Sequence, residues 1–445
     1  MMDKMLRIIT LLFCVYVTQG IAQTQDSKPR VVVMTDGEVD DHSSMIRFLL
    51  YTCDIDLLAI IETNSIFQRN GHSKEDWFEK QLEAYKNVYP NLMKHNPDYP
   101  TPEKLKSISF VGDEDIEHLK GLREKRWELI PGAKITYEPS NWKDTQGSNK
   151  IIELLLEDNK APVYIQVWGG ANTAARAFYR LKKDHPNDYK RALSKVVMYN
   201  IWYQDGAGNY IEQNFPEVTM IYCGAFEGTW NYRSQKDTYD FITNNVKNNH
   251  GTLGGLYPQG YVSEGDSPAF FYNINNGLRN HEHPTYGGWG GRFENISGFQ
   301  KVYKDAVDGG DKRNSLKRWI DVVNNDFQAR MDWCVAEKFN DANHPPIVSL
   351  KNSLNLLVTP GQKIKLNAER TMDPDGDTLS FNWWQYEEAG SYNGKIVISN
   401  SDNPKAFFTV PADAKKGATI HVICEVNDSG VPHLTGYQRV VLTIK

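Results

Sequence analysis

Four carboxylates lie within six residues in the segment Asp36-Gly37-Glu38-Val39-Asp40-Asp41. Carboxylates at this spacing repel one another unless a cation neutralises them. Oxygen ligands without nitrogen or sulfur are typical of sites for hard cations such as Ca²⁺ and Mg²⁺. Gly37 allows the sharp backbone turn that could aim several of these side chains at one point. The alternative is an acidic turn that caps the next helix, but a position directly after an apolar run favours a cation site.

That apolar run is the first of several that alternate with helical patterns between residues 30 and 278. The expected strands are Val31–Met34, Leu57–Ile61, Ser107–Val111, Val163–Trp168, Lys195–Ile201 and Thr219–Tyr222. Continuous apolar strands separated by helices indicate an α/β fold, a mostly parallel sheet with helices on both faces. Ligands of such sheets bind beyond the carboxyl ends of the strands, so the polar residues that close each strand are candidate site residues.

The pattern of predicted secondary structure changes towards the C-terminus. Residues 280–310 are loop-like, and Ser315 to about Phe339 has helical spacing. Asn343-His344-Pro345-Pro346 resembles a linker, because Pro-Pro cannot continue a helix. Short alternating runs separated by turn residues then predict a small immunoglobulin-like β-sandwich. We therefore expect an α/β domain over 23–342, a linker over 343–347 and a sandwich over 348–445.

The carboxylate segment and the residues that close later strands resemble the nucleoside hydrolase superfamily, in which Asp-x-x-x-Asp-Asp follows the first strand. Further motifs occur in the same order as in that superfamily. They are Asn64 after the second strand, the loop Gly169-Gly170-Ala171-Asn172-Thr173, the pair Glu212 and Asn214, and Asp266 in Glu264-Gly265-Asp266-Ser267-Pro268. The resemblance covers about residues 30–278.

The resemblance implies a Ca²⁺ site held by Asp36, Asp41 and Asp266, with a backbone carbonyl near Trp168 or Gly169 as a further ligand. It implies that Asp36 is also the catalytic base that takes a proton from the attacking water. The residues implied to hold sugar hydroxyls are Asp40, Asn64, Glu212 and Asn214.

The sequence also departs from the superfamily pattern. Met34 stands where the family has an Asp, and Gly37-Glu38 replaces Pro-Gly. About 40 residues between Asn64 and Ser107, including Trp77 and Tyr85, resemble an enlarged segment. These differences favour a glycan over a nucleoside as the substrate.

A narrower resemblance is to a secreted bacterial group commonly called cellulose-binding proteins. It rests on Glu264–Pro268, on the glycine-rich loop Tyr286-Gly287-Gly288-Trp289-Gly290-Gly291-Arg292 and on the C-terminal sandwich. Glycines on both sides of Trp289 predict an exposed indole on which a sugar ring could stack, so Trp289 is a candidate substrate contact. The alternative is a buried Trp at a tight turn.

Other candidate residues favour structural roles. His281 and His283 could protonate a leaving group near neutral pH, but loop histidines more often have no catalytic part. His42 is expected to cap or pair with the acidic segment. Asp373-Pro374-Asp375-Gly376-Asp377 resembles a calcium loop, yet Trp384 stands where a helix–loop–helix calcium site needs Glu, which favours a turn between strands.

The N-terminus predicts export to the periplasm or the extracellular space. Lys4 and Arg7 precede an apolar run that is too short to cross a bilayer, and a small-residue cleavage site follows, so residues 1–22 are expected to be a signal peptide. The net charge of −6 without a basic patch argues against a nucleic-acid partner. Cys53, Cys223, Cys334 and Cys424 form no CxxC pair, which argues against zinc. A homo-oligomer is possible.

Three functions remain open on the sequence. The favoured one is a secreted Ca²⁺-dependent hydrolase of a glycosidic bond, acting on an oligosaccharide or polysaccharide. The second is a carbohydrate (cellulose)-binding protein without catalysis, and the third is an exported nucleoside hydrolase. Retention of a complete set of metal and hydroxyl ligands favours catalysis, because a binding module needs no such set.

Overall fold

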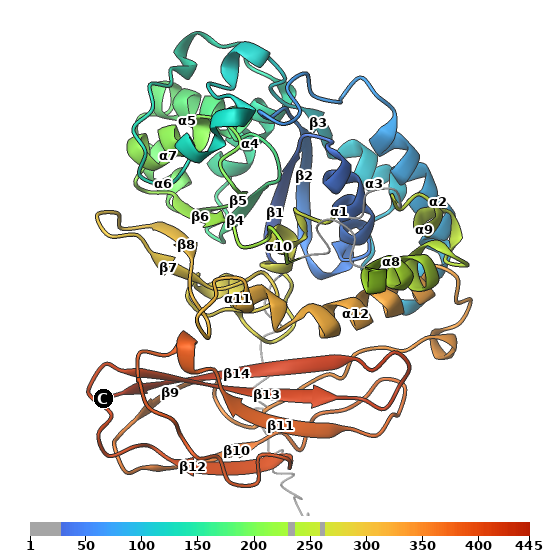
Figure 1. The fold of residues 1–445 in the computed structure, drawn as a ribbon, viewed down its shortest axis with the longest axis vertical. Helices are drawn as coiled ribbons and strands as arrows, with labels where there is room; N and C mark the ends of the chain where they lie inside the picture. Colours follow the sequence, from blue (N-terminus) through green and yellow to red (C-terminus); the bar gives the residue numbers. More distant parts are fainter. Residues whose placement is uncertain (1–27, 230–235, 259–262) are drawn as a thin grey trace, which may run out of the picture.

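The computed structural model describes residues 28–229, 236–258 and 263–445, and it divides into an α/β part and a β-sandwich (Figure 1). The predicted signal peptide, residues 1–22, lies outside the described residues. Within these residues, no helix combines the length and apolar character that a membrane span requires.

The α/β part is built on an eight-stranded sheet with the order β3-β2-β1-β4-β5-β6-β8-β7. All its strands are parallel except β7, which pairs antiparallel with β8. The fold class predicted from the apolar runs is therefore confirmed. The strands are β1 (Arg30–Thr35), β2 (Asp56–Glu62), β3 (Ser109–Val111), β4 (Val163–Val167), β5 (Val196–Ile201), β6 (Thr219–Cys223), β7 (Phe293–Asn295) and β8 (Val302–Asp305).

Helices pack on both faces of this sheet, and each face has its own apolar core. The helices are α1 (Val39–Leu49), α2 (Trp77–His95), α3 (Pro102–Ser107), α4 (Gln146–Leu156), α5 (Asn172–Asp184), α6 (Tyr189–Leu193), α7 (Ala207–Asn214), α8 (Lys236–Ile242), α9 (Gly251–Gly255), α10 (Ser267–Phe271), α11 (Asn314–Lys317) and α12 (Ile320–Trp333). A short 3₁₀ helix, η3 (Arg123–Glu128), lies in the segment after β3.

Two predictions about the region after residue 280 need correction. The stretch predicted as loop contains the hairpin β7–β8, whose three- and four-residue strands are too short to give an apolar pattern. The helix predicted from Ser315 to Phe339 is divided at Trp319 into α11 and α12, and α12 ends at Trp333. The Trp333 indole N–H donates to the Asn343 carbonyl at 2.9 Å, which ties the helix end to the linker.

The sandwich has a four-stranded sheet, β11-β13-β14-β9, and a two-stranded sheet, β10-β12. Its strands are β9 (Asn355–Val358), β10 (Lys363–Asn367), β11 (Ser380–Gln385), β12 (Lys405–Thr409), β13 (Thr419–Asn427) and β14 (Thr435–Ile444). Strands β13 and β14 lie against the lower side of the α/β part in Figure 1. The four cysteines in the described residues are buried free thiols.

Candidate active site

The carboxylate segment lies at the carboxyl end of β1, where ligands of parallel sheets are expected to bind. Asp36 directly follows the strand, and Asp40 and Asp41 fall in the first turn of α1, where the helix dipole favours negative charge. Glu38 is the N-cap residue, but its side chain makes no capping hydrogen bond. Gly37 has a φ of +71°, and a Cβ there would lie 2.8 Å from the Cβ of His72. The turn therefore needs glycine.

Asp266 joins this segment from a distant part of the chain, at the N-cap of α10. Carboxylate oxygens of Asp40, Asp41 and Asp266 all lie within 4.8 Å of one another. The side chain of Asp36 packs against Gly169 at the end of β4, where a Cβ would come within 2.6 Å of it. Three of the predicted metal-site residues, Asp36, Asp41 and Asp266, are thus brought together with Asp40. We call Asp36, Asp40, Asp41 and Asp266 the carboxylate cluster.

Burial raises the pKa of every carboxyl in the carboxylate cluster, because the charged form loses its hydration. Repulsion adds to this effect: Asp36 raises the pKa of Asp40, which reaches about 7, and Asp41 does the same to Asp266. The neighbouring Glu38 reaches a pKa of about 8, first through burial and then through Asp40 and Asp36. The protein has thus concentrated acidic groups where water stabilises their charge poorly.

The hydrogen bonds of the cluster satisfy only part of its oxygens. Asp41 accepts from the Thr35 hydroxyl and from the backbone N–H of Asp36 at 3.2 Å. The Oδ2 atoms of Asp36 and Asp266 are buried and have no hydrogen-bond partner among the described residues. None of the four carboxylates pairs with a Lys or Arg in the described part of the chain. The oxygens of Asp40, Asp41 and Asp266, within 4.8 Å of one another, fit a cation with Ca²⁺–O distances of about 2.3–2.6 Å.

Residues around the cluster hold it in place. Arg47 and Glu264 form an ion pair of 2.7 Å in which both side chains are fully buried. Glu264 also accepts from the Ser267 hydroxyl at 3.1 Å, so it fixes the turn that carries Asp266. His42 stacks on Trp77 of α2, with ring centroids 4.6 Å apart. Its ring also makes a hydrogen bond to the backbone of Gly37, so the expected contact with the acidic segment is present as a hydrogen bond.

A cavity of about 580 Å³ opens beside the cluster, and Glu38 and Asp40 line it. We call it the carboxylate pocket. Its aromatic walls are Phe67, Trp202 and Phe226, with the Trp202 and Phe226 rings 4.6 Å apart. Trp202 has a φ of +57°, which is rare for a bulky residue and is found where surrounding structure enforces it. Arg123, Arg126 and Glu227 are the other charged residues of the lining.

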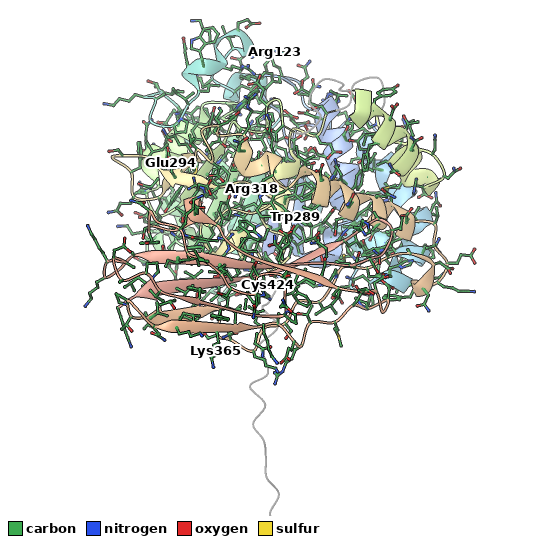
Figure 2. All side chains as sticks on the ribbon, turned by 60° about the horizontal axis from the view of Figure 1, so that its bottom comes forward. Arg123, Trp289, Glu294, Arg318, Lys365 and Cys424 are labelled. Carbon is green, nitrogen blue, oxygen red and sulfur yellow. The ribbon has the colours of Figure 1, made fainter. Side chains whose placement is uncertain are left out.

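The sequence interpretation did not include these aromatic residues. A signal for one of them existed, because Trp202 directly follows β5 and so belongs to the carboxyl ends that form the crevice. Phe67 lies in a loop and Arg126 in the short helix η3, and neither carries a comparable signal. Figure 2 places Arg123 at the end of the molecule opposite Lys365 of the sandwich.

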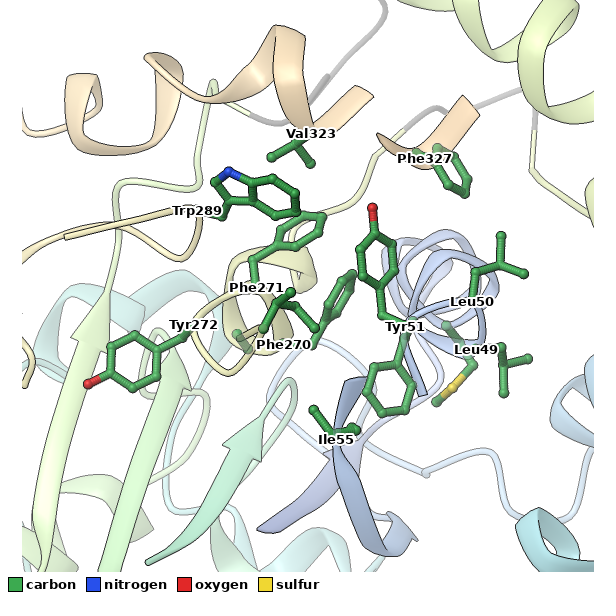
Figure 3. Close-up of a cluster of buried hydrophobic side chains, with 14 of the residues drawn as sticks. Leu49, Leu50, Tyr51, Ile55, Phe270, Phe271, Tyr272, Trp289, Val323 and Phe327 are labelled. Carbon is green, nitrogen blue, oxygen red and sulfur yellow. The ribbon is translucent and has the colours of Figure 1, made fainter. Parts of the chain in front are cut away.

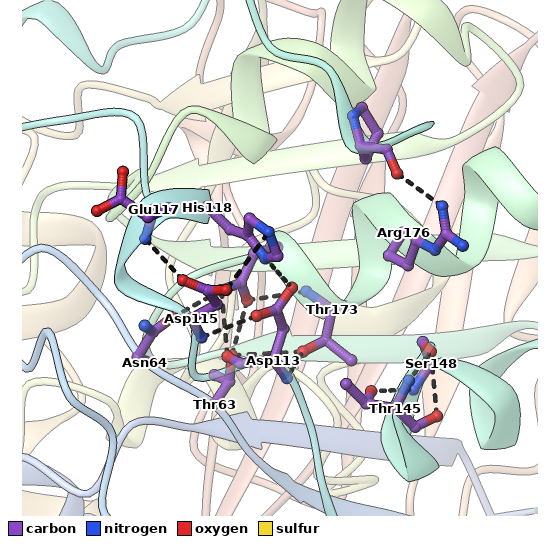
Figure 4. Close-up of polar contacts among 12 residues, drawn as sticks. Thr63, Asn64, Asp113, Asp115, Glu117, His118, Thr145, Ser148, Thr173 and Arg176 are labelled. Carbon is purple, nitrogen blue, oxygen red and sulfur yellow. Dashed lines mark hydrogen bonds and ion pairs between the residues drawn. The ribbon is translucent and has the colours of Figure 1, made fainter. Parts of the chain in front are cut away.

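Asn64 lies near the cluster but its side chain is already engaged. Its Oδ1 accepts from Asn172 at 2.7 Å and its Nδ2 donates to the Arg69 carbonyl at 2.9 Å. Figure 4 shows Asn64 beside Thr63, Asp113 and Thr173 of the same polar network. These bonds fix the turn 65–69, which carries Phe67 into the pocket. The structure therefore gives Asn64 a positioning contact, and Asn172 of the glycine-rich loop takes part in the same network.

Glu212 and Asn214 are not brought to the carboxylate cluster. Glu212 accepts from the Gly132 N–H at 2.7 Å and from the Tyr203 hydroxyl at 3.0 Å. Asn214 is exposed and donates to the Tyr210 carbonyl of its own helix. The contacts of Glu212 fasten the segment after β3 to α7, and a sugar-binding role for either residue stays a prediction without support from its position.

The prediction of an exposed Trp289 is wrong. Its side chain is 3% exposed and packs edge-on against Phe271 (Figure 3). On the sandwich side its ring meets that of Tyr437. The flanking glycines serve close packing: a Cβ at Gly290 would lie 2.4 Å from the backbone nitrogen of Tyr272. His281 and His283 lie in the same region, and the Tyr164 hydroxyl donates to the His281 carbonyl.

The predicted backbone ligand is also partly occupied. The carbonyl of Trp168 accepts from the Gln204 side-chain amide, which bonds the Ile201 carbonyl as well, at 3.0 Å. Gln204 lines the carboxylate pocket and joins the ends of β4 and β5. A cation at the carboxylate cluster would share that carbonyl with Gln204.

Comparisons with known proteins agree with this architecture. Residues 30–293 match the family model described as "Cellulose-binding Sde182, nucleoside hydrolase-like domain", and residues 363–444 match "Cellulose-binding protein Sde0182, C-terminal domain". No curated protein matches the chain.

Among solved structures, a nucleoside hydrolase-related protein from Saccharophagus degradans, described as associated with carbohydrate metabolism, is 31% identical with a TM-score of 0.80. The match covers 94% of this chain and 100% of that one. A plant nucleoside hydrolase is 10% identical with a TM-score of 0.35, covering 68% of this chain and 98% of its own. The chain belongs to the cellulose-binding family in which a nucleoside hydrolase-like domain is followed by a C-terminal sandwich.

Proposed function

We propose that the protein is a secreted Ca²⁺-dependent hydrolase that cleaves a glycosidic bond in an oligosaccharide or polysaccharide. The observation that carries the proposal is the carboxylate cluster, in which buried carboxylates converge with no Lys or Arg partner in the described residues and two of their oxygens have no hydrogen bond. Unpaired buried charge is costly, so such a cluster is retained where a ligand from outside the chain compensates it.

In this proposal Asp36, Asp41 and Asp266 hold the cation, and Asp40 lies close enough to share it. Bound Ca²⁺ would neutralise part of the charge and favour deprotonation of water near Asp36. Asp36 is the base, because its Oδ2 has no hydrogen bond and it lies at the closed end of the site, against Gly169. Its contribution as a general base is about 10²- to 10⁴-fold in rate.

The substrate would enter through the carboxylate pocket. Asp40 lines that pocket and can accept a hydrogen bond from a sugar hydroxyl, while Trp202, Phe67 and Phe226 offer faces to the C–H side of a ring. Residual negative charge from Asp40 and Glu38 would stabilise the positive charge that develops on the sugar ring in the transition state.

Carbohydrate binding without catalysis is the second candidate, and the family's description as cellulose-binding favours it. It leaves unexplained why a binding module would keep buried carboxylates with free oxygens, which stacking on a glycan does not need. A nucleoside substrate is the third candidate, and the pocket's aromatic walls would suit a base as well as a sugar.

Calorimetric titration of Ca²⁺ into the mature protein tests the metal site. We expect one binding event that Asp41→Asn and Asp266→Asn abolish. Asp321→Asn, an exposed carboxylate on α12, is the matched control and should bind as wild type does. Because Asp373, Asp375 and Asp377 form a second acidic group in the sandwich, Asp373→Asn is measured too. Ca²⁺ binding that persists in Asp41→Asn but vanishes in Asp373→Asn would contradict the proposal.

Catalysis is tested separately, by release of reducing ends from a panel of glycans and of sugar from nucleosides. Asp36→Asn should lower the rate at least a hundred-fold while leaving glycan binding in place. If folded, Ca²⁺-loaded wild type releases nothing from any substrate yet binds glycans, the binding interpretation replaces the catalytic one. Release from nucleosides alone would favour the third candidate.

A further inference from the structure

The segment from Lys120 to Lys134, between β3 and α4, is strongly cationic in an acidic chain. It contains Lys120, Arg123, Lys125, Arg126 and Lys134 but only two carboxylates, Glu124 and Glu128, whereas the whole chain has a net charge of −6. Most of these side chains are exposed. The segment lies at the end of the molecule farthest from the sandwich (Figures 1 and 2).

Two cavities share this segment as a common wall. Arg123 and Arg126 line the carboxylate pocket, whereas Lys120, Lys125, Trp127 and Lys134 line a second cavity of about 620 Å³. Arg123 and Arg126 face the same pocket because they are three residues apart in η3, and residues three apart share a face of a 3₁₀ helix. Lys125 has non-helical angles, and the chain bends there. We call the second cavity the lysine pocket.

The cationic groups are held ready for a ligand. The Arg126 guanidinium lies 4.2 Å from the Trp202 ring centre, and that of Arg123 lies 5.4 Å from Phe67. Stacking orders a guanidinium and leaves its N–H edges free to bind a carboxylate or sulfate in the ring plane. The ion pair Arg126–Glu227 is long, at 3.6 Å, and both side chains are about half exposed, so a ligand anion can replace it.

The wall itself is fixed to the core. Asn209 and Gln213 of α7 donate to the carbonyls of Ile130 and Ala133, both at 2.7 Å, in addition to the Glu212 bond to Gly132. Trp127, on this wall, is 65% exposed, the kind of aromatic face on which a sugar ring stacks. Glu212, which was predicted to hold sugar, thus helps to support the surface that carries cations and an exposed Trp.

Charge decides where an acidic sugar could lie. In the described residues no Lys or Arg pairs with the carboxylate cluster, so an acidic ring placed against it would meet acidic groups and no cationic side chain. Arg123 and Arg126 line the carboxylate pocket, and the lysines of the wall line the lysine pocket next to it. Acidic substituents therefore belong on sugar units next to the one that contacts the carboxylates.

We propose that the segment Lys120–Lys134 is a subsite for acidic sugar units of a glycan that runs from the carboxylate pocket across the wall into the lysine pocket. This proposal rests on the proposed function in taking the carboxylate pocket as the place of cleavage. The shared chemistry is an anionic substituent, either the carboxylate of a uronic acid or a sulfate ester.

The test measures binding and requires neither Ca²⁺ nor turnover. The catalytically inert Asp36→Asn protein is titrated without added Ca²⁺ with hexagalacturonate, with a sulfated hexasaccharide and with neutral cellohexaose. We expect Arg123→Gln/Arg126→Gln and Lys125→Gln/Lys134→Gln each to weaken binding of one or both acidic probes at least ten-fold, with cellohexaose unchanged. Trp127→Ala should weaken binding of every probe that occupies the lysine pocket.

The control is Lys104→Gln/Lys106→Gln, which removes the same charge from exposed positions on α3, before the amino end of β3. It should leave binding unchanged. Equal affinity for a hexamer of thymidylate would overturn the proposal in favour of general polyanion attraction. Cellohexaose binding that exceeds the acidic probes in every variant would overturn it as well. Since Ca²⁺ is absent, a failed metal site would not alter these results.

Discussion

Two of the regions in which this molecule buries charged side chains differ in how the protein stabilises the charge. At the junction between the α/β part and the sandwich, fully buried Arg439 donates to the carbonyls of Tyr286 and Gly287. Nearby, Asp308 accepts from Arg292 at 2.7 Å and from the Tyr386 hydroxyl at 2.7 Å. The carboxylate cluster, in contrast, gathers charges of one sign.

The difference separates a structural use of buried charge from a functional one. At the junction Arg439 is held by backbone carbonyls and Asp308 by an arginine and a tyrosine hydroxyl, so groups of the chain itself stabilise these charges. At the carboxylate cluster folding brings acidic groups together, and the resulting repulsion is relieved by bound protons or, in our proposal, by a cation. Arg47 and Glu264 lie between these cases, because their closed ion pair holds the turn that carries the unpaired Asp266.

The largest effect is expected from Arg47→Met. Removing one partner of a fully buried ion pair leaves the Glu264 carboxylate uncompensated and costs about 3–5 kcal/mol in the free energy of unfolding. The turn of Asp266 would also lose its support, so Ca²⁺ affinity should fall. Denaturant unfolding and calorimetry measure both. The double variant Arg47→Met/Glu264→Leu should recover part of the stability but not the Ca²⁺ binding.

Trp289→Ala tests the junction alone. Loss of a buried indole packed on Phe271 and Tyr437 should cost about 3–5 kcal/mol in the free energy of unfolding. Because Trp289 does not line the carboxylate pocket, glycan binding and Ca²⁺ affinity should stay near wild type at temperatures where the variant is folded. A variant as stable as wild type that no longer binds glycan would restore the platform interpretation.

Trp289 also shows what the sequence could predict and what it could not. Apolar runs predicted a mostly parallel sheet and placed Asp36 at a strand end, where ligands of such sheets bind. Asp41 and Asp266 were expected at the same site only because the sequence resembles the nucleoside hydrolase superfamily, since Asp266 starts a helix and follows no apolar strand. Trp289 in its glycine-rich loop could be exposed or packed, and the contact with the sandwich that decided between them joins elements distant in sequence. The pocket residues Phe67 and Arg126 lie in segments between strands, and no hydrophobic periodicity of the sequence predicts the conformation of those segments.

The carboxylate cluster should make the free energy of unfolding depend on pH. In the Ca²⁺-free protein burial and repulsion raise the pKa of Asp40 to about 7 and of Glu38 to about 8. The folded state then binds more protons than the unfolded chain between about pH 4 and pH 8, so the free energy of unfolding falls as pH rises through that window.

Thermal unfolding of the EDTA-treated protein should therefore show a lower midpoint at pH 8 than at pH 5. Saturating Ca²⁺ should reduce this difference, since the cation takes over the role of the protons. In Asp40→Asn the dependence without Ca²⁺ should be shallower. A Ca²⁺-free midpoint that rises between pH 5 and pH 8 would show that other groups dominate.

The smallest effect is expected from Glu388→Gln, at the rim of the junction. Glu388 pairs with Arg318 at 3.9 Å, and both side chains are 31% exposed, so water screens the attraction. The change should cost less than about 1 kcal/mol in the free energy of unfolding, and this cost should vanish at high salt.

Asp308→Asn is the variant to compare with it, because Asp308 also lies close to Arg318. Its side chain is fully buried and pairs with Arg292, and Arg318 lies 3.8 Å away. We expect it to cost more than Glu388→Gln at every salt concentration. If the two variants cost the same, rim charges would hold the junction, and the buried contacts would no longer distinguish it from the carboxylate cluster.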